Sequence, residues 1–387
     1  MIDTQRALDE LLNHLAGEPE VAIDCEMDSM YAYSTSLCVV QVGWPDGEAL
    51  IDGLAPLDRT RLAALFADPD VLKIFHGGEN DVGLLADRWG FEISHLFDTM
   101  AAAQVLGHDG VGLAAQLDRH FDVHVSKRFQ KADWRVRPLP EDQAEYARLD
   151  VRYLIPLRDI LLEELQALNR EREASSEFAR IAKASIQEKP FEPDNWARVK
   201  GCKDLPPKAR GILREVYVAR DQLSREADKA PYRVMHDSAL LALATHAPSS
   251  EQAYNRLRGV NRKLSSAGVK LLLEAVARGK ELGEIPIPRV KSGRRRPFNA
   301  GDARLTPDQE KLFEALRGWR TQRAQTRGVD VARVATSALL GAIAQASPLD
   351  HAALAAVDGM EDWRVEEYGE EILSVVKKRL DKQRDSK

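Results

Sequence analysis

The residues with the clearest chemical potential are two carboxylates placed close together in an apolar run. Asp24 and Glu26 are separated by one residue within 21–27, which predicts a short strand. Side chains two residues apart on a strand point to the same face, so these two would lie side by side. If they are buried, like-charge repulsion would place a proton on one of them unless a divalent cation balances the charge. The alternative is a strand edge at which both carboxylates reach solvent.

Two further acids and a tyrosine occupy positions from which they could join this pair. Asp81 follows a strand-like run at 72–76 and a diglycine turn, which places it at the start of a helix. Tyr146 and Asp150 are four residues apart in a helical stretch and therefore share one face of that helix. Taken singly, Asp81 could be an ordinary helix-start acid and Tyr146 a surface aromatic. Together, four acids suit a pair of Mg²⁺ or Mn²⁺ ions, which bind carboxylate oxygen and water.

The elements that would position these residues predict an α/β domain over the first part of the chain. Three strand-like runs lie close together and favour a meander, and a fourth follows before helical periodicity takes over. A mixed sheet with flanking helices is therefore expected. The expected strands are 21–27, 36–44, 48–52 and 72–76, and the expected helices are 80–89, 98–106 and 141–168.

The rest of the chain contains an internal repeat with a period close to 100 residues. Each copy indicates four or five helices, and no strand pattern is convincing there. Two copies of one all-α module are therefore expected, joined by a basic linker that is rich in proline. The matched positions are Arg220 and Arg320, Ala239 and Ala338, Pro248 and Pro348, Gly259 and Gly359, and Gly268 and Gly369.

The composition excludes several classes of protein. No uncharged apolar run approaches the ~18 residues of a membrane span, no secretory signal is visible at the start, and three scattered cysteines cannot build a disulfide framework. These features indicate a cytoplasmic protein with no membrane partner. The net charge of −6 hides a split: residues 1–200 carry −15, whereas residues 201–387 carry +9. The average charge therefore does not exclude a nucleic-acid partner.

These motifs carry a resemblance to a known family. Asp24-x-Glu26, His76-x-x-x-Asn80-Asp81 and Tyr146-x-x-x-Asp150 resemble the three exonuclease motifs of the DEDD superfamily, in its tyrosine-bearing branch. The segment 127–134 (KRFQKADW), followed by Arg137, is similar to ribonuclease D. In that family helical HRDC modules follow the nuclease, and residues 205–283 resemble one. Residues 304–381 resemble a second, more diverged copy.

The resemblance implies an organisation and a chemistry. It implies a ribonuclease H-like exonuclease domain at 1–190, a connector at 191–204, a first module at 205–283, a basic linker at 284–303 and a second module at 304–381. It also implies two divalent cations, Mg²⁺ or Mn²⁺, held by Asp24, Glu26, Asp81 and Asp150. Tyr146 would orient the attacking water, since a phenol with its pKa near 10 is a poor base at neutral pH.

Contacts to the substrate are expected from a basic and aromatic segment near residue 130. Cationic and aromatic side chains that alternate can hold phosphates and stack on the bases of a single-stranded 3′ end. The alternative is a charged surface loop with a tryptophan in the core. His76 is interpreted as a hydrogen-bonding residue at a strand end in preference to a metal ligand, because hard metals prefer oxygen. A zinc site at His120 and His124 would have no further ligands. The expected RNA contacts are His76, Asn80, Lys127, Phe129, Trp134 and Arg137.

The function expected from this resemblance is a metal-dependent 3′–5′ exoribonuclease that releases nucleoside 5′-monophosphates. Its partners would be RNAs with a free 3′ end, tRNA precursors among them, with DNA possible in vitro, and the family precedent is a monomer. A 3′–5′ DNA exonuclease is the first alternative, because the same four acids serve such enzymes. An RNA-binding scaffold without turnover is the second.

Overall fold

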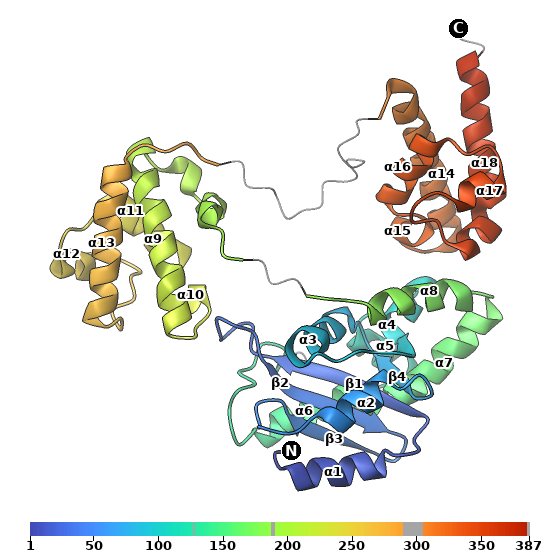
Figure 1. The fold of residues 1–387 in the computed structure, drawn as a ribbon, viewed down its shortest axis with the longest axis horizontal. Helices are drawn as coiled ribbons and strands as arrows, with labels where there is room; N and C mark the ends of the chain where they lie inside the picture. The colour runs from blue at the N-terminus through green and yellow to red at the C-terminus, as the bar shows by residue number, and fades with distance from the viewer. Residues whose placement is uncertain (127, 187–189, 289–304, 385–387) are drawn as a thin grey trace.

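The computed structural model describes residues 1–126, 128–186, 190–288 and 305–384, which form an N-terminal α/β domain and two helical modules (Figure 1). Each of these three parts has its own large hydrophobic core. Lys127 and most of the basic linker expected at 284–303 lie outside the described residues. In the described part of the chain, no helix combines the length and apolar character needed to cross a membrane.

A five-stranded mixed sheet forms the centre of the N-terminal domain. Its strands are β1 (Glu20–Met27), β2 (Leu37–Trp44), β3 (Gly47–Asp52), β4 (Leu72–Phe75) and β5 (Leu96–Asp98). Their order is β3-β2-β1-β4-β5, with antiparallel pairing among β1, β2 and β3 and parallel pairing of β4 with β1 and β5. This confirms the expected mixed sheet. It adds β5, which is only three residues long and too short to show a period in the sequence.

Helices cover this sheet (Figure 1). They are α1 (Gln5–His14), α2 (Thr60–Ala67), α3 (Glu79–Trp89), α4 (Thr99–Leu106), α5 (Leu113–Phe121), α6 (Glu141–Arg152), α7 (Leu154–Ala167) and α8 (Glu171–Ala182). The single helix expected over 141–168 is divided at Tyr153. Pro156 explains the division, because it has no N–H to donate to the carbonyl of Arg152 and its ring crowds that carbonyl. As a result α6 is a separate helix from α7, and it packs across β1, β2 and β3.

The first helical module has a core that extends beyond its expected boundary. It contains two short 3-10 helices, η1 (Pro193–Arg198) and η2 (Cys202–Asp204), followed by α9 (Pro207–Glu226), α10 (Pro231–Val234), α11 (Asp237–His246), α12 (Glu251–Arg256) and α13 (Ser266–Leu282). Trp196, Val199 and Cys202 are buried in the core of this module. Part of the segment expected as a connector at 191–204 is therefore packed structure, because large apolar side chains anchor it.

The second module repeats the first. Its helices are α14 (Pro307–Arg327), α15 (Val331–Val334), α16 (Ser337–Ala346), α17 (His351–Ala355) and α18 (Asp362–Arg384). The repeat extends to hydrogen bonds. Arg220 donates to the Met235 carbonyl oxygen at 3.1 Å, and Arg320 donates to the Ala335 carbonyl oxygen at the same distance. The expected internal repeat is thus seen in the packing as well as in the sequence.

The second module lies against α8 of the N-terminal domain. Arg327 donates to Glu173 at 2.6 Å, and both side chains are more than 90% buried. Arg333 pairs with Glu177 at 3.0 Å, and the exposed Arg172 pairs with Glu366. Breaking a buried ion pair leaves an uncompensated charge, so the pair of Arg327 and Glu173 favours this one arrangement of the two parts.

Candidate active site

Asp24 and Glu26 lie on β1, the central strand of the sheet. Strand alternation places both on one face, whereas Ile23 and Cys25 on the opposite face are buried. In the antiparallel ladder Asp24 is paired with Gln41 of β2, and Gln41 Nε2 donates a hydrogen bond to Asp24 Oδ2 at 3.3 Å. β1 pairs with β4 only at residues 20–22, and Asp24 and Glu26 are partly exposed. Burial nevertheless raises the pKa of both carboxyls, which a strand edge open to solvent would not do.

Asp81 reaches the same region from the first turns of α3. After β4 the chain turns through Gly77, which has φ +70, a backbone conformation that glycine adopts without strain. Asp98 then accepts a hydrogen bond from the Gly78 N–H at 2.7 Å, which fixes the start of α3. Asp81 is buried there, and burial followed by the negative charge of Asp24 raises the pKa of its carboxyl well above the usual value.

Tyr146 and Asp150 come from α6, one helical turn apart. This helix can approach the sheet closely because Gly43 of β2 has no side chain. A Cβ at Gly43 would lie 3.3 Å from Val151 Cβ, which is tighter than ordinary van der Waals contact. The residue after Asp150 therefore rests directly on the backbone of β2, and Asp150 is held beside the carboxylates of β1.

The three carboxylates of Asp24, Glu26 and Asp150 form one cluster. One oxygen from each lies within 4.8 Å of the other two. Burial raises the pKa of Asp24 to about 7, and burial together with the charge of Asp24 raises the pKa of Asp150 to about 8. Burial and the charges of its neighbours raise the pKa of Glu26 to about 10. Without a cation, the cluster therefore retains protons at neutral pH.

This donor set fits a divalent cation. Carboxylate oxygens are the ligands that Mg²⁺ and Mn²⁺ prefer, and the cluster supplies them from β1 and α6. A cation would displace the protons and stabilise the ionised carboxylates, which burial disfavours. Asp81 interacts electrostatically with Asp24 and Glu26 from α3, so it lies on the side where a second ion could bind.

Tyr146 is held as a neutral hydrogen-bonding group beside the cluster. Its ring contacts Phe129 and Trp134, with centroids 5.9 and 6.1 Å away, and the side chain of Gln130 hydrogen-bonds its phenol. Burial, followed by the charge of Asp150, raises the pKa of Tyr146 above its usual value. At neutral pH the phenol therefore keeps its proton and can donate or accept a hydrogen bond, but it cannot act as a base.

Two residues expected to contact RNA serve the fold instead. Trp134 is 1% exposed, so neither face of its ring is open to a base. Arg137 binds Asp52 with two hydrogen bonds of 2.7 and 2.6 Å and donates to the carbonyl oxygens of Cys38 and Trp134. Because its donors are engaged inside the protein, the expectation of RNA contacts from Trp134 and Arg137 is corrected. The core-tryptophan alternative applies to Trp134.

The other described candidates for RNA contact differ in exposure. Asn80 is exposed at the start of α3, and Phe129 is partly exposed. His76 Nδ1 lies 2.8 Å from Thr99 Oγ1, whose hydroxyl donates to the Phe75 carbonyl oxygen. The hydroxyl is thus the acceptor from His76, so Nδ1 carries the proton and the buried Nε2 is an acceptor with no partner among the described residues. Burial lowers the pKa of His76 to about 4, which keeps the ring neutral.

Gln41 is a residue of this site that the sequence patterns did not single out. It is fully buried on β2, and it is the residue that fixes one oxygen of Asp24. A signal was available, because Gln41 is a lone polar side chain within the apolar run of β2, LCVVQVGW. A buried amide in such a strand needs a partner, and the partner here is a catalytic candidate.

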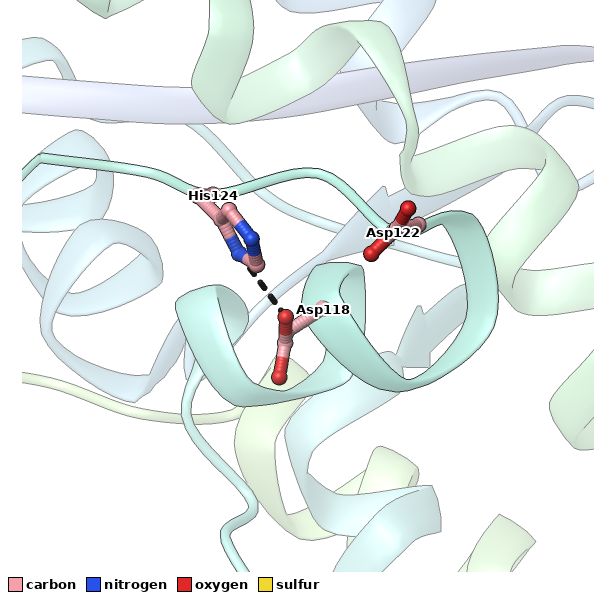
Figure 2. A group of neighbouring side chains, drawn as sticks. All are labelled: Asp118, Asp122 and His124. Atoms are coloured by element: carbon pink, nitrogen blue, oxygen red, sulfur yellow. Dashed lines mark ion pairs between the residues drawn. The ribbon is translucent and has the colours of Figure 1, made fainter.

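A second group of possible metal ligands lies on the surface (Figure 2). Asp118, Asp122 and His124 gather at the end of α5, where His124 Nδ1 pairs with Asp118 Oδ1 at 2.8 Å. All three are exposed, and exposed acidic groups of this kind are common without an ion. His120 is not part of the group, and its ring packs against that of His108 with centroids 5.9 Å apart. The structure therefore gives no support to a zinc site formed by His120 and His124.

Comparison with known families divides the chain in the same way as the fold. A 3′–5′ exonuclease family model matches residues 1–166, and an HRDC domain model matches twice, at residues 209–276 and 309–376. The two HRDC matches are offset by 100 residues, which is the period of the internal repeat.

Individual relatives extend over most of the chain. It is 32% identical over 306 residues to ribonuclease D of Gluconacetobacter diazotrophicus, covering 77% of this chain and 76% of the relative. It is 30% identical to ribonuclease D of Sphingobium indicum, covering 98% of this chain and 95% of the relative. In fold it is similar to the crystal structure of Escherichia coli RNase D, with a TM-score of 0.59 over 98% of both chains at 24% identity.

Proposed function

The chain belongs to the ribonuclease D family and is a 3′–5′ exoribonuclease of the DEDD superfamily, and from this premise we propose that Asp24, Glu26, Asp81 and Asp150 form its catalytic metal site. The observation that carries the proposal is the cluster of partly buried carboxylates of Asp24, Glu26 and Asp150, whose oxygens lie within 4.8 Å of one another. Enzymes of this superfamily use divalent metal ions. We assign two ions to the site, Mg²⁺ or Mn²⁺, because the four acids come from both sides of Asp24.

Different residues of the chain have different roles in the reaction that we propose. Bound divalent ions supply an acidified water molecule and balance the charge on the phosphate and on the leaving oxygen. Asp24, Glu26 and Asp150 would hold the ion on the side of the attacking water. Asp24 would also reach the second ion, which Asp81 supports directly or through water. Gln41 fixes the Asp24 carboxylate with a hydrogen bond to Oδ2.

Tyr146 orients the water that attacks the last phosphodiester. The phenol remains protonated at neutral pH, so it positions the water by hydrogen bonding and does not remove its proton. The water oxygen loses a proton to solvent and bonds to phosphorus, the bond from phosphorus to the 3′ oxygen breaks, and that 3′ oxygen takes up a proton. The products are a nucleoside 5′-monophosphate and an RNA that is one nucleotide shorter.

The substrates that we propose are RNAs with a free 3′ end, tRNA precursors among them. The relatives carry the name ribonuclease D, and the positive charge of residues 201–387 suits a polyanion. We assign catalysis to residues 1–190 and capture of longer RNA to the module at 205–283, with 304–381 as the second module. Three free, buried cysteines suit a monomer in the reducing cytoplasm.

One assay tests the proposed function. A 3′-labelled tRNA precursor and a single-stranded DNA are each incubated with Mg²⁺, with Mn²⁺ or with EDTA. We expect release of nucleoside 5′-monophosphates from RNA with either metal and none with EDTA. Asp24→Asn and Asp150→Asn should abolish release while retaining RNA binding in a filter assay. Normal turnover by either variant would refute the assignment of the metal site, and faster digestion of DNA would favour the DNA exonuclease alternative.

A further inference from the structure

The connection between β1 and β2, residues 28–36, joins the strand of Asp24 and Glu26 to the first helical module. Figure 1 shows this connection reaching α10. The Met30 carbonyl oxygen accepts hydrogen bonds from Tyr232 Oη at 2.6 Å and from Arg233 Nε at 2.8 Å. The Ala230 N–H donates to the Tyr31 carbonyl oxygen at 3.0 Å. Backbone groups that begin four residues after Glu26 are therefore held by the other part of the protein.

Side chains on both parts add to this contact. Tyr33 Oη donates to the buried Asp221 at 2.8 Å. Asp228 accepts from the Tyr33 N–H at 3.2 Å and from the Ser34 N–H at 3.4 Å. Asp228 has φ +43, a conformation in which aspartate, asparagine and glycine are favoured. The first module is thus hydrogen-bonded to the 28–36 connection at its centre as well as near its start.

The same contact extends to the segment that packs on Tyr146. Tyr31 Oη donates to the Lys131 carbonyl oxygen at 2.9 Å, and Arg135 lies 3.9 Å from Asp28 and 4.0 Å from Asp228. Phe129 and Gln130, which contact the ring and the phenol of Tyr146, belong to this segment. The first module therefore reaches two backbone segments, one leading from the metal cluster and one lying against the water-orienting tyrosine.

We propose that the first helical module positions the active site, and that Asp228 and Arg233 are the positioning residues through which it acts. It does so by holding residues 28–36 and, through them, residues 128–136. This inference rests on the proposed function, because its effect is read in the rate of hydrolysis. It differs from a role in RNA capture, since a module that only tethers RNA has no effect on a substrate too short to need a tether.

The second module provides a matched control. Arg333 stands at the position of Arg233 in the repeat, yet it pairs with Glu177 of α8. On the same interface the exposed Arg172 pairs with Glu366. Arg172→Ala therefore loosens a contact between a module and the N-terminal domain without touching residues 28–36 or 128–136.

The experiment compares full-length variants on two single-stranded RNAs, a trinucleotide and a 24-nucleotide strand, with Mn²⁺. The double variant Asp228→Gly with Arg233→Ala removes the acceptor and one donor, and glycine tolerates the positive φ. We expect kcat on the trinucleotide to fall by about tenfold, with KM within about twofold, since small misplacements of catalytic groups are costly. The single variant Asp228→Asn keeps an acceptor oxygen and should have most of the wild-type kcat. The control Arg172→Ala should have the same kcat as the wild type.

The outcomes separate the inference from the proposed function. A wild-type protein that does not shorten RNA would refute the proposed function itself. An unchanged kcat on the trinucleotide, with a raised KM on the 24-nucleotide strand alone, would overturn the inference and leave the module as a tether. If the double variant fails to fold by circular dichroism, Tyr33→Phe carries the same test, because it keeps the ring and removes only the hydroxyl that donates to Asp221 and accepts from Arg225. A lowered kcat supports the inference, and an unchanged kcat overturns it.

Discussion

Gln41 lies directly across the antiparallel ladder from Asp24, and its Nε2 donates to Asp24 Oδ2 at 3.3 Å. The amide is fully buried, so it cannot turn away to water. The position of Oδ2 of the carboxylate is thereby tied to the neighbouring strand. The orientation of the Asp24 carboxylate consequently depends on a residue that carries no charge.

Gln41→Leu should weaken metal binding. The substitution keeps the volume of the side chain but removes the donor that orients Asp24, and loss of a partner of this kind costs about 10-fold or more in metal affinity. Calorimetric titration of the variant with Mn²⁺ should show this rise in Kd, and the Mn²⁺ needed for half-maximal hydrolysis should rise in parallel.

Val42→Ala serves as the control for Gln41→Leu. It removes buried apolar volume from the same strand, so it should lower the Tm without altering Mn²⁺ affinity. An equal Mn²⁺ affinity in Gln41→Leu and the wild type would show that Asp24 needs no support from β2.

Tyr146→Phe should lower kcat by about 100-fold, with little change in KM. The ring can keep its contacts with Phe129 and Trp134, whereas the hydroxyl that we propose to orient the water is lost. Single-turnover hydrolysis at saturating RNA measures the effect. The pH profile of kcat should keep its shape, because the phenol stays protonated throughout the neutral range; a wild-type rate would remove Tyr146 from the reaction.

Asp150→Asn should stabilise the metal-free protein, and the gain should grow with pH. An aspartate in the unfolded chain ionises near pH 4, whereas burial and the charge of Asp24 raise the pKa of Asp150 in the fold to about 8. Stability is therefore lost progressively from about pH 4 to pH 8 as the folded protein retains a proton that the unfolded chain releases. Asparagine does not ionise, so the variant does not lose stability in this way as the pH rises. Thermal unfolding in EDTA should show a larger difference in Tm at pH 8 than at pH 5.

Saturating Mn²⁺ is the control for this pH dependence. The wild type gains stability from the bound ion, whereas the variant has lost a ligand, so the order of the two Tm values should reverse. A Tm difference in EDTA that is the same at both pH values would contradict a raised pKa for Asp150.

Arg137→Lys should lower stability and leave RNA affinity unchanged. A lysine cannot reproduce the two hydrogen bonds to Asp52 or the further bonds to backbone carbonyls, and we expect a loss of about 1–3 kcal/mol in the free energy of unfolding. Urea unfolding measures that loss, and RNA binding is compared where both proteins are folded. Arg128→Lys, at an exposed position, controls for the change of side chain; a drop in RNA affinity specific to Arg137→Lys would restore it as an RNA contact.

Much of the fold could be predicted because its signals are local. The alternation at Asp24 and Glu26, the four-residue spacing of Tyr146 and Asp150, and the repeat that relates Arg220 to Arg320 depend on residues close in sequence or on a fixed offset. The three residues of β5 are too few to show such a period. The division of the helix at Tyr153 is a consequence of Pro156, which the helical pattern around it obscured.

The predictions that failed depend on partners distant in the sequence. Arg137 is 85 residues from Asp52, and nothing near Arg137 indicates that its donors are already used. Trp134 lies among basic residues that suggest a surface, yet it packs under Tyr146. The contact of Tyr33 with Asp221 spans 188 residues, so no local pattern reveals that the first module reaches the nuclease domain.

The short helices α10 and α15 occupy equivalent places in the two copies of the repeat, and each turns an arginine toward the N-terminal domain. Arg233 donates to a backbone carbonyl near the strand of Asp24 and Glu26, whereas Arg333 pairs with a carboxylate on α8. The copies are therefore not interchangeable parts. A chimera that carried α14–α18 in both places would bring Arg333 to the Met30 carbonyl but would lack Tyr232 and Asp228, replaced by Ala332 and Gly328. When such a module is grafted onto another nuclease, its effect will depend more on the residues that contact the nuclease domain than on the helices of its own core.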